Sequence, residues 1–479
     1  MKQIRTFGEC LDGIMRVRGI SAQRLADLLN YKSKTSVVRV LRDQSNRESR
    51  EKLFAGISGL DLFSHAKLRA LSEALEVSRV GRDSAGMRAM LRRALFSADE
   101  HAEAVNPALA GALKALEEAH SAHIIVIECC WPHLFERLRS ILEKRPRHRL
   151  DHFVGIGSRK NQTMSTLCSL MCIAHMGSYS CNALMADEET CDSLKGRNMI
   201  CFCAQDREGR SVDTLIIFSD AHSAVTLSLP TDQGLFDFAR RIVAQRRYAP
   251  VVSCYEPFEG PVTFVDQMRF CTEMERDANW ALVTPYLCIN AVPTHIVRSA
   301  LTDGGVLHSF PQLDERRVRV YLEEFLYFHS LRYKALFSSA HLRGHIASRQ
   351  SMRRFALTGM LDDEYLPVRP LTTQERLAVL QGLLDLMRND ERFVLRFRRN
   401  ESNLGIRAYC FSETGVLTHP IKTISSLYMN YRASIIRHPR LVELFEECFW
   451  DDLLRNHALS REESVAYLEG LVRELREGA

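Results

Sequence analysis

The spacing of apolar residues changes near residue 121, and this change most constrains the fold. Before that point apolar residues recur every three to four positions, which is typical of amphipathic helices. After it, short continuous apolar runs alternate with helical patterns, as in a sheet covered by helices. The sequence therefore predicts a multidomain α+β protein. We expect an all-α N-terminal part, a central mixed-sheet α/β domain and a mainly helical C-terminal region with a small sheet.

The N-terminal part is predicted to begin with two short helices. Gly19 ends the first, because glycine readily adopts the conformation that follows a helix. Ser21 is a suitable cap for the second, whose buried side carries Leu25. Asn30 can then begin a tight turn, since asparagine tolerates the left-handed backbone conformation better than most residues.

A third helix follows this turn, and a fourth comes after it. Val37, Val40 and Leu41 are expected to face inward from the third helix. The segment SAQRLADLLNYKSKTSVVRVLRD resembles the helix-turn-helix of the lambda-repressor and Cro class, often called XRE. The resemblance implies that the third helix is a recognition helix that enters the major groove of double-stranded DNA.

Seven polar residues of the turn and the third helix are the predicted DNA-binding residues. Arg39 suits a bidentate contact with guanine, whereas Lys32, Lys34 and Arg42 suit contacts with phosphates. The alternative is a protein-docking module with a solvated basic face. The full set is Lys32, Ser33, Lys34, Thr35, Ser36, Arg39 and Arg42.

The charge distribution agrees with a polyanionic partner at the N-terminus. Residues 1–57 hold twelve Lys and Arg against six Asp and Glu, a net charge of +6. The whole chain carries +5, so the remaining residues sum to −1. Because modules of this kind usually gain affinity by pairing across a two-fold site, we also expect a homodimer.

The central part is predicted to contain a βαβ unit. HIIVIECC and LDHFVGI have the pattern of strands, and WPHLFERLRSILEK between them has that of an amphipathic helix. The loop GIGSRKNQT follows the second strand, and its residues Gly155, Gly157, Arg159 and Lys160 could cradle an anionic effector. A plain turn between strand and helix is the alternative, because the loop is neither a P-loop nor a full GxGxxG motif.

Cysteines supply the candidates for a metal site. Cys168, Cys172 and His175 would share one face of a helix. The alternative is core packing, because cysteine behaves as a small buried hydrophobe. The fourteen cysteines are expected to be reduced thiols, and we predict no metal and no cofactor.

Beyond residue 250 the pattern is mainly helical, with a strand-like LVTPYLCI inside it. RFVLRFR and IRAYCFS are predicted to be a pair of strands near the C-terminus. Ser460 and Glu463 have the spacing of a capping box for the last helix. No internal repeat is evident.

Several function classes lack their signatures. The chain contains no HExxH motif and no GxSxG nucleophile elbow, so no catalytic residue is predicted. It contains no apolar run of the roughly 20 residues that a membrane helix needs, and its start does not have the pattern of a secretory signal. We therefore expect a cytoplasmic protein without a membrane partner.

These features together predict a sequence-specific DNA-binding transcriptional regulator with a signal-sensing or oligomerisation region. The alternatives are an enzyme or nucleic-acid-processing factor recruited by its helix-turn-helix, and an assembly protein that uses this module for docking. The identity of the effector does not follow from the sequence. The expected segments are a DNA-binding domain (1–63), a helical connector (64–120), an α/β sensor domain (121–249), a mainly helical region (250–365) and an α+β domain (366–479).

Overall fold

The chain divides into two compact units, residues 1–92 and 93–479, and each is described separately. The predicted boundary at 63 lies inside the first unit, and those at 120, 249 and 365 lie inside the second. The computed structural model describes residues 6–42, 44–58, 60, 63, 67–68, 70–72, 74–75, 87–88, 90–92, 95, 107–187, 190–191, 198–218, 224–231, 234–254, 261–285, 287–301, 314–361, 368–399, 406–420 and 434–477.

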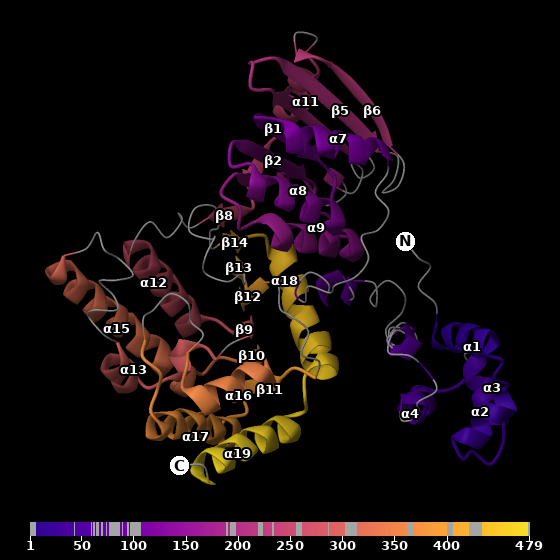
Figure 1. Ribbon diagram of the computed structural model, residues 1–479, viewed down its shortest axis with the longest axis vertical. Coiled ribbons are helices and arrows are strands. Elements are labelled where there is room, and N and C mark those ends of the chain that lie inside the picture. Colours follow the sequence, from indigo (N-terminus) through magenta and orange to yellow (C-terminus); the bar gives the residue numbers. More distant parts are fainter. Residues whose placement is uncertain are drawn as a thin grey trace. The chain divides into compact units, whose positions relative to one another are not determined.

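The first unit contains the four predicted helices (Figure 1). A capping box between Thr6 and Glu9 starts the first helix, and Gly19 ends it with φ of 65°. A compact core of apolar side chains joins the helices, and Phe63 and Leu71 from the following segment also contribute to it. The helices are α1 (Phe7–Arg18), α2 (Ala22–Leu28), α3 (Thr35–Leu41) and α4 (Arg47–Ser58).

The second unit begins with a seven-stranded mixed sheet of order β6-β5-β4-β1-β2-β3-β7. Its first strands form the predicted βαβ unit, with β1 and β2 parallel. The elements are α7 (Pro107–Glu118), β1 (Ser121–Ile127), α8 (Pro132–Lys144), β2 (His148–Val154), α9 (Lys160–Ile173), β3 (Tyr179–Leu184), β4 (Met199–Gln205), β5 (Ser211–Phe218), β6 (Ala224–Pro230), α11 (Leu235–Ala244) and β7 (Tyr248–Pro250).

Helices cover the two faces of this sheet. Phe135 of α8 packs against His152 on one face, with ring centroids 4.8 Å apart. Phe236 of α11 packs against His123 on the other, at 5.0 Å. The buried carboxylate of Asp213 holds α11 in place, because it accepts a hydrogen bond from the Phe236 N–H at 2.8 Å and another from the Thr231 hydroxyl at 2.9 Å.

A second seven-stranded mixed sheet follows, of order β11-β10-β9-β12-β13-β14-β8. Its elements are β8 (Val252–Cys254), α12 (Pro261–Asp277), β9 (Trp280–Val283), the 3₁₀ turn η2 (Ile289–Ala291), α13 (Thr294–Ala300), α15 (Glu315–Ser338), β10 (Arg343–Ala347), α16 (Arg349–Thr358), α17 (Thr373–Asn389), β11 (Phe393–Phe397), β12 (Ile406–Phe411), β13 (Gly415–Pro420), β14 (Ser434–Ile436), α18 (Pro439–Cys448), the π-helical η4 (Phe449–His457) and α19 (Arg461–Glu477).

The C-terminal half therefore differs from the predicted helical region with a small sheet. The predicted strands RFVLRFR and IRAYCFS exist as β11 and β12, but their predicted pairing is wrong, because β10 and β9 lie between them. The capping box of the last helix is confirmed: the Glu463 N–H donates to Ser460 Oγ at 3.1 Å, and the Ser460 N–H donates to the Glu463 carboxylate at 2.6 Å.

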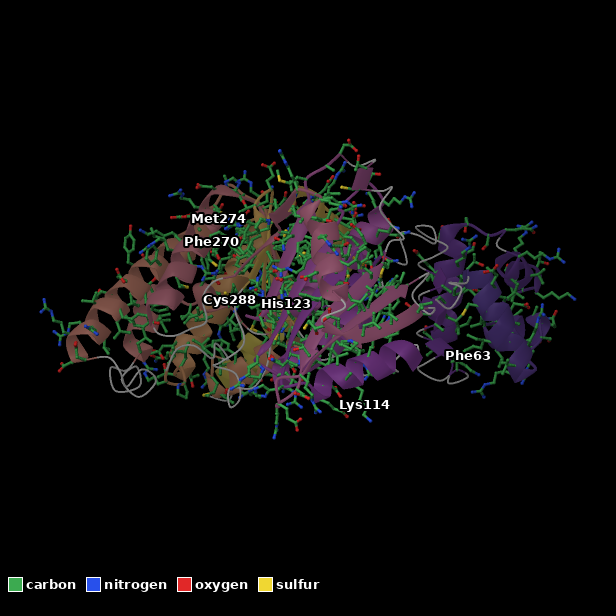
Figure 2. All side chains as sticks on the ribbon, turned by 90° about the horizontal axis from the view of Figure 1, so that it is seen from above. Phe63, Lys114, His123, Phe270, Met274 and Cys288 are labelled. Atoms are coloured by element: carbon green, nitrogen blue, oxygen red, sulfur yellow. The ribbon has the colours of Figure 1, made fainter. Side chains whose placement is uncertain are left out.

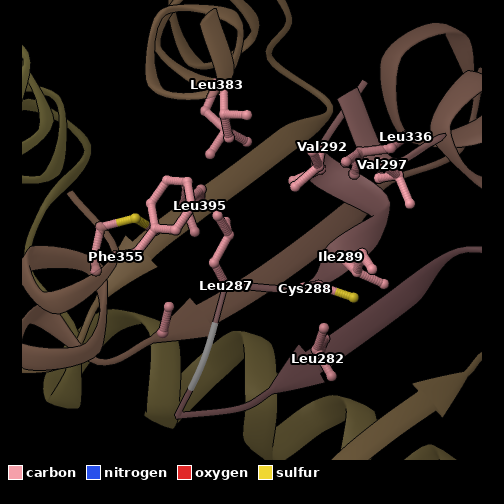
Figure 3. Close-up of a cluster of buried hydrophobic side chains, with 14 of the residues drawn as sticks. Leu282, Leu287, Cys288, Ile289, Val292, Val297, Leu336, Phe355, Leu383 and Leu395 are labelled. Carbon is pink, nitrogen blue, oxygen red and sulfur yellow. The ribbon is translucent and has the colours of Figure 1, made fainter. Parts of the chain in front are cut away.

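The second sheet shares one extended core with its helices. Leu282 and Leu395 of the sheet pack in the same cluster as Phe355 of α16 and Leu383 of α17 (Figure 3). Phe270 and Met274 of α12, labelled in Figure 2, lie partly buried against this cluster. No helix of the described ranges has the length and apolar character needed to cross a membrane.

The two sheets repeat one topology, a relationship that was not evident from the sequence. In the first, β1 pairs with parallel β2 and antiparallel β4, β2 continues to parallel β3, and β4 continues through antiparallel β5 to β6. In the second, β9, β10, β11, β12, β13 and β14 occupy the same positions with the same directions. Each half thus contains six equivalent strands and adds one strand of its own, β7 or β8.

Three buried histidines make this second unit sensitive to acid. Burial lowers the pKa of His152 to about 3, of His329 to about 4 and of His345 to about 3. Their folded-state pKa values lie below the unfolded value of about 6.5, so the folded state disfavours their protonation. The free energy of unfolding is therefore highest above the unfolded pKa of about 6.5. Below that pH it falls by about 4 kcal/mol per pH unit for the three histidines together.

We expect the second unit to open between about pH 6 and 4 while α1–α4 remain folded, because residues 1–60 contain no histidine. Hydrogen exchange of the full chain, corrected for the pH dependence of intrinsic rates, measures both units in one sample. Equal loss of protection in α1–α4 and in β1–β3 would contradict this expectation.

Candidate nucleic-acid interface

The turn that leads to the third helix has the predicted local structure. The Ser21 hydroxyl caps α2 by accepting a hydrogen bond from the Arg24 N–H at 3.1 Å. The chain leaves α2 at Asn30, which adopts the left-handed conformation with φ of 57°. The Tyr31 N–H then donates to the Ala26 carbonyl at 2.8 Å, so the turn closes back onto the preceding helix. This agrees with the role of Asn30 inferred from its residue type.

Helix α3 packs against the core of the first unit through one side. Val37 and Val40 are buried in the core of the first unit, together with Leu25 and Ala26 of α2. The Ser33 hydroxyl accepts a hydrogen bond from the Thr35 N–H at 3.3 Å, at the start of the helix. Because the helix has one buried side, its remaining side chains must point outward.

All seven predicted DNA-binding residues are exposed. They are Lys32, Ser33, Lys34, Thr35, Ser36, Arg39 and Arg42. None of the four cations among them forms an ion pair with an acidic side chain of the described residues, whereas Arg16 of α1 pairs with Asp12 at 2.6 Å. These four cations therefore form a basic surface on and beside α3 that no acidic side chain of the described residues neutralises. We call these seven residues the basic face.

The size of α3 suits a DNA groove. Like any α-helix, it is about 10–12 Å across with its side chains. The major groove of B-DNA is about 12 Å wide and admits one helix. Arg39 lies within this helix and offers a planar guanidinium, the group that best matches the two acceptors on a guanine edge.

The predicted effector loop lies between β2 and α9. One of its backbone N–H groups, which could have bound an effector, already donates to a side chain of the protein. The Gly155 N–H donates to the carboxylate of Glu128 at 2.9 Å. Glu128 is buried and has φ of 56° at the end of β1. A Cβ atom at Gly155 would lie 3.3 Å from that carboxylate and from the Cys191 carbonyl. The glycine thus permits close packing around the buried Glu128 side chain.

Gly157 and Lys160 of the loop line a small pocket of about 50 Å³, which we call the Lys160 pocket; Arg159 does not line it. Lys160 pairs with Glu447 of α18 at 2.8 Å, which raises the pKa of the lysine. Arg159 is exposed just before α9. The two cations and two carboxylates at the pocket balance each other, so it has no excess positive charge for an anion. Its lining residues are Gly157, Ser158, Lys160, Thr163, Arg440, Glu443, Leu444 and Glu447.

The predicted metal candidates lie in the core beside the first sheet. Cys168, Cys172 and His175 are all buried. Burial raises the pKa of the Cys168 thiol well above its ordinary value, which favours the protonated form over the thiolate that binds metals. No three His, Cys, Asp or Glu side chains within the described residues are grouped so that they could hold a metal ion. The cysteines whose side chains are described are free thiols.

Comparisons of the chain with protein-family models, with curated proteins and with solved structures find no match. The interpretation of the basic face therefore depends on its own chemistry. Sequence reasoning predicted that these seven side chains point outward, and all are exposed, because caps, turn and helical period are local signals. It did not anticipate the Glu128 carboxylate at the effector loop, since that contact joins segments 27 residues apart.

The conformation of Asn30 gives a test of the turn. Replacement of Asn30 by Ala should destabilise the turn by about 1 kcal/mol, because alanine tolerates the left-handed region less well. Replacement by Gly should preserve it. The measurement is hydrogen exchange at the Tyr31 amide in the full chain, with protection falling about five-fold for the alanine variant. Similar loss in both variants would show that the asparagine side chain, not the backbone conformation, holds the turn.

Proposed function

We propose that the protein is a sequence-specific DNA-binding transcriptional regulator. The observation that carries this proposal is the basic face on and beside α3, whose four cations have no acidic partner in the described residues. In the proposed complex α3 enters the major groove and Arg39 contacts a guanine. Lys32, Lys34 and Arg42 bind phosphates on either side and fix the orientation of the helix.

The large second unit has a separate role in this proposal. It receives the signal or assembles the active oligomer, and so shifts the protein between DNA-competent and incompetent states. The Lys160 pocket is the proposed place for an effector.

Arg39 provides the test of sequence readout. Selection from random duplexes by the full chain should enrich one sequence. Arg39→Ala should then weaken binding to that sequence by about 1–3 kcal/mol and relax preference at one base pair. Relative to Arg39→Ala, Arg39→Lys should regain the electrostatic attraction to the phosphates but not the bidentate contact with guanine.

Arg207→Ala is the matched control, because Arg207 is an exposed arginine of the second unit without an ion pair in the described residues. It should leave both affinity and preference unchanged. Enrichment of no sequence by the wild-type chain would reject the proposed function. Loss of a protein partner on Arg39→Ala, with DNA binding intact, would instead favour a docking module.

Lys34 tests the phosphate contacts separately. Each neutralised phosphate releases counterions, so the logarithm of affinity falls with the logarithm of salt concentration. Lys34→Ala should weaken binding to all sequences equally and reduce this salt slope by about 1. Fluorescence anisotropy between about 50 and 200 mM salt measures the slope. A changed base preference with an unchanged slope would place Lys34 at a base edge instead of at a phosphate.

A further inference from the structure

Exposed apolar side chains gather at one edge of the first sheet. Of the eleven large apolar side chains that are exposed in the described part of the chain, five belong to β5, β6 or α11: Val212, Ile217, Val225, Leu227 and Phe238. Val225 is 74% exposed and Leu227 is 46% exposed. Ile217 pairs directly with Val225, and Leu215 with Leu227, so these side chains lie on one face of the sheet.

Helix α11 packs on this face over β4 and β5 but leaves Val225 and Leu227 of β6 exposed. Leu215 of β5 and Cys201 of β4 lie in one buried cluster with Phe236 and Ala239 of α11. The buried Asp213 carboxylate fixes the start of the helix over the same strands. The cluster includes no side chain of β6, so Val225 and Leu227 remain uncovered by it.

Strand β6 also lies at the end of its sheet, and its outer edge pairs with no other strand of the described residues. It is the terminal strand of its sheet and contains seven residues, AVTLSLP, without a charged side chain. The other terminal strands are short or charged: β7 and β8 have three residues each, and β11 carries Arg396. Exposed edges usually carry charge or proline or are kept short, because a long apolar edge pairs with other strands. The proline of β6, Pro230, is its last residue and leaves the centre of the strand free of these devices.

The duplicated topology shows what this edge can accept. Strand β14 occupies in the second sheet the position that β6 occupies in the first. The outer edge of β14 pairs with an additional antiparallel strand, β8. At β6 the sheet of the described residues ends without such a strand. The fold thus accommodates a further antiparallel strand at this position.

We propose that β6 of a second copy of the chain pairs antiparallel with β6 across a two-fold axis and joins the two sheets into one. The strand is complementary to itself about Leu227. In that register Leu227 faces its own copy and Val225 faces Leu229, so aliphatic side chains meet on one face. Thr226 faces Ser228 on the other, which places hydroxyl groups together. Such cross-strand pairs stabilise antiparallel sheets.

A second copy fits this edge better than an unrelated peptide because the match lies within the strand itself. An isologous contact requires a surface that is complementary to itself, and a strand that pairs about its own centre satisfies this requirement. The inference rests on the edge and on the duplicated topology, and it is independent of DNA binding. Its failure would leave the proposed function of the basic face unaffected.

Cross-linking tests the register in the full chain. Leu227→Cys should give a disulfide-linked dimer under mild oxidation with oxidised glutathione, because directly opposed residues have Cβ atoms about 4.5–5.5 Å apart. Val225→Cys is the matched control from the same strand. Its two copies would lie about 14 Å apart, four residues along the strand, which is beyond disulfide reach. The wild-type chain, treated in parallel, reports any reaction of its native cysteines.

Sedimentation equilibrium without DNA tests the interface itself. The wild-type chain should have a molar mass in solution of twice its chain mass of 54.7 kDa. The double substitution Val225→Lys, Leu227→Lys should raise the dimer dissociation constant at least ten-fold. Val320→Lys, at an exposed apolar residue of α15, should have no effect. A monomeric wild type, a dimer unaffected by the double substitution, or cross-linking of the Val225→Cys variant but not of the Leu227→Cys variant would each overturn the proposal.

Discussion

Each half of the second unit depends on a central strand that is buried on both faces. β1 and β9 bind a parallel strand on one side and an antiparallel strand on the other, so neither has a free edge. The helices that return the chain between parallel strands also cover the faces of the sheet. A strand in this position has almost no contact with water and must be apolar along most of its length. All four residues of β9 are buried, as are the last four of β1.

This constraint explains how much of the fold could be predicted from the sequence. β1 was predicted because its apolar run is continuous, and the βαβ unit followed from it. β10 was not, although all five of its residues are buried, because Arg343, Gly344 and His345 interrupt the apolar pattern. The Arg343 guanidinium pairs with Asp390, and Gly344 leaves room for the rings of Phe449 and Trp450, which a Cβ atom would meet at 2.5 and 2.6 Å. These partners are distant in the chain, so no local pattern reveals them.

The basic face was more predictable, for the opposite physical reason. Ser21, Asn30 and Val37 each act through neighbours within a few residues, and helical period then decides which side chains point outward. The partner of an exposed cation, in contrast, need not belong to the chain. The exposed cations suit the polyanionic partner that we propose, but they do not distinguish one polyanion or one base sequence from another. That distinction depends on base contacts, and Arg39 is the side chain of this face best suited to make them.

The duplicated sheets support the proposed dimer, whose two-fold symmetry is compatible with the proposed DNA binding although each proposal rests on its own observations. The six strand positions that the two halves share are the common framework of the fold. The strands that differ between the halves, β7 and β8, are additions specific to each half. The second half closes its β14 edge with β8, whereas in the first half the sheet of the described residues ends at β6, a strand of seven residues and no charge. An edge that served only as a boundary would gain from a lysine or glutamate, because charge suppresses unwanted strand pairing. The apolar character of β6 is therefore better explained by a paired edge. An antiparallel strand paired with its own copy generates a two-fold axis, and DNA-binding modules of the helix-turn-helix kind use the same symmetry to bind two half-sites.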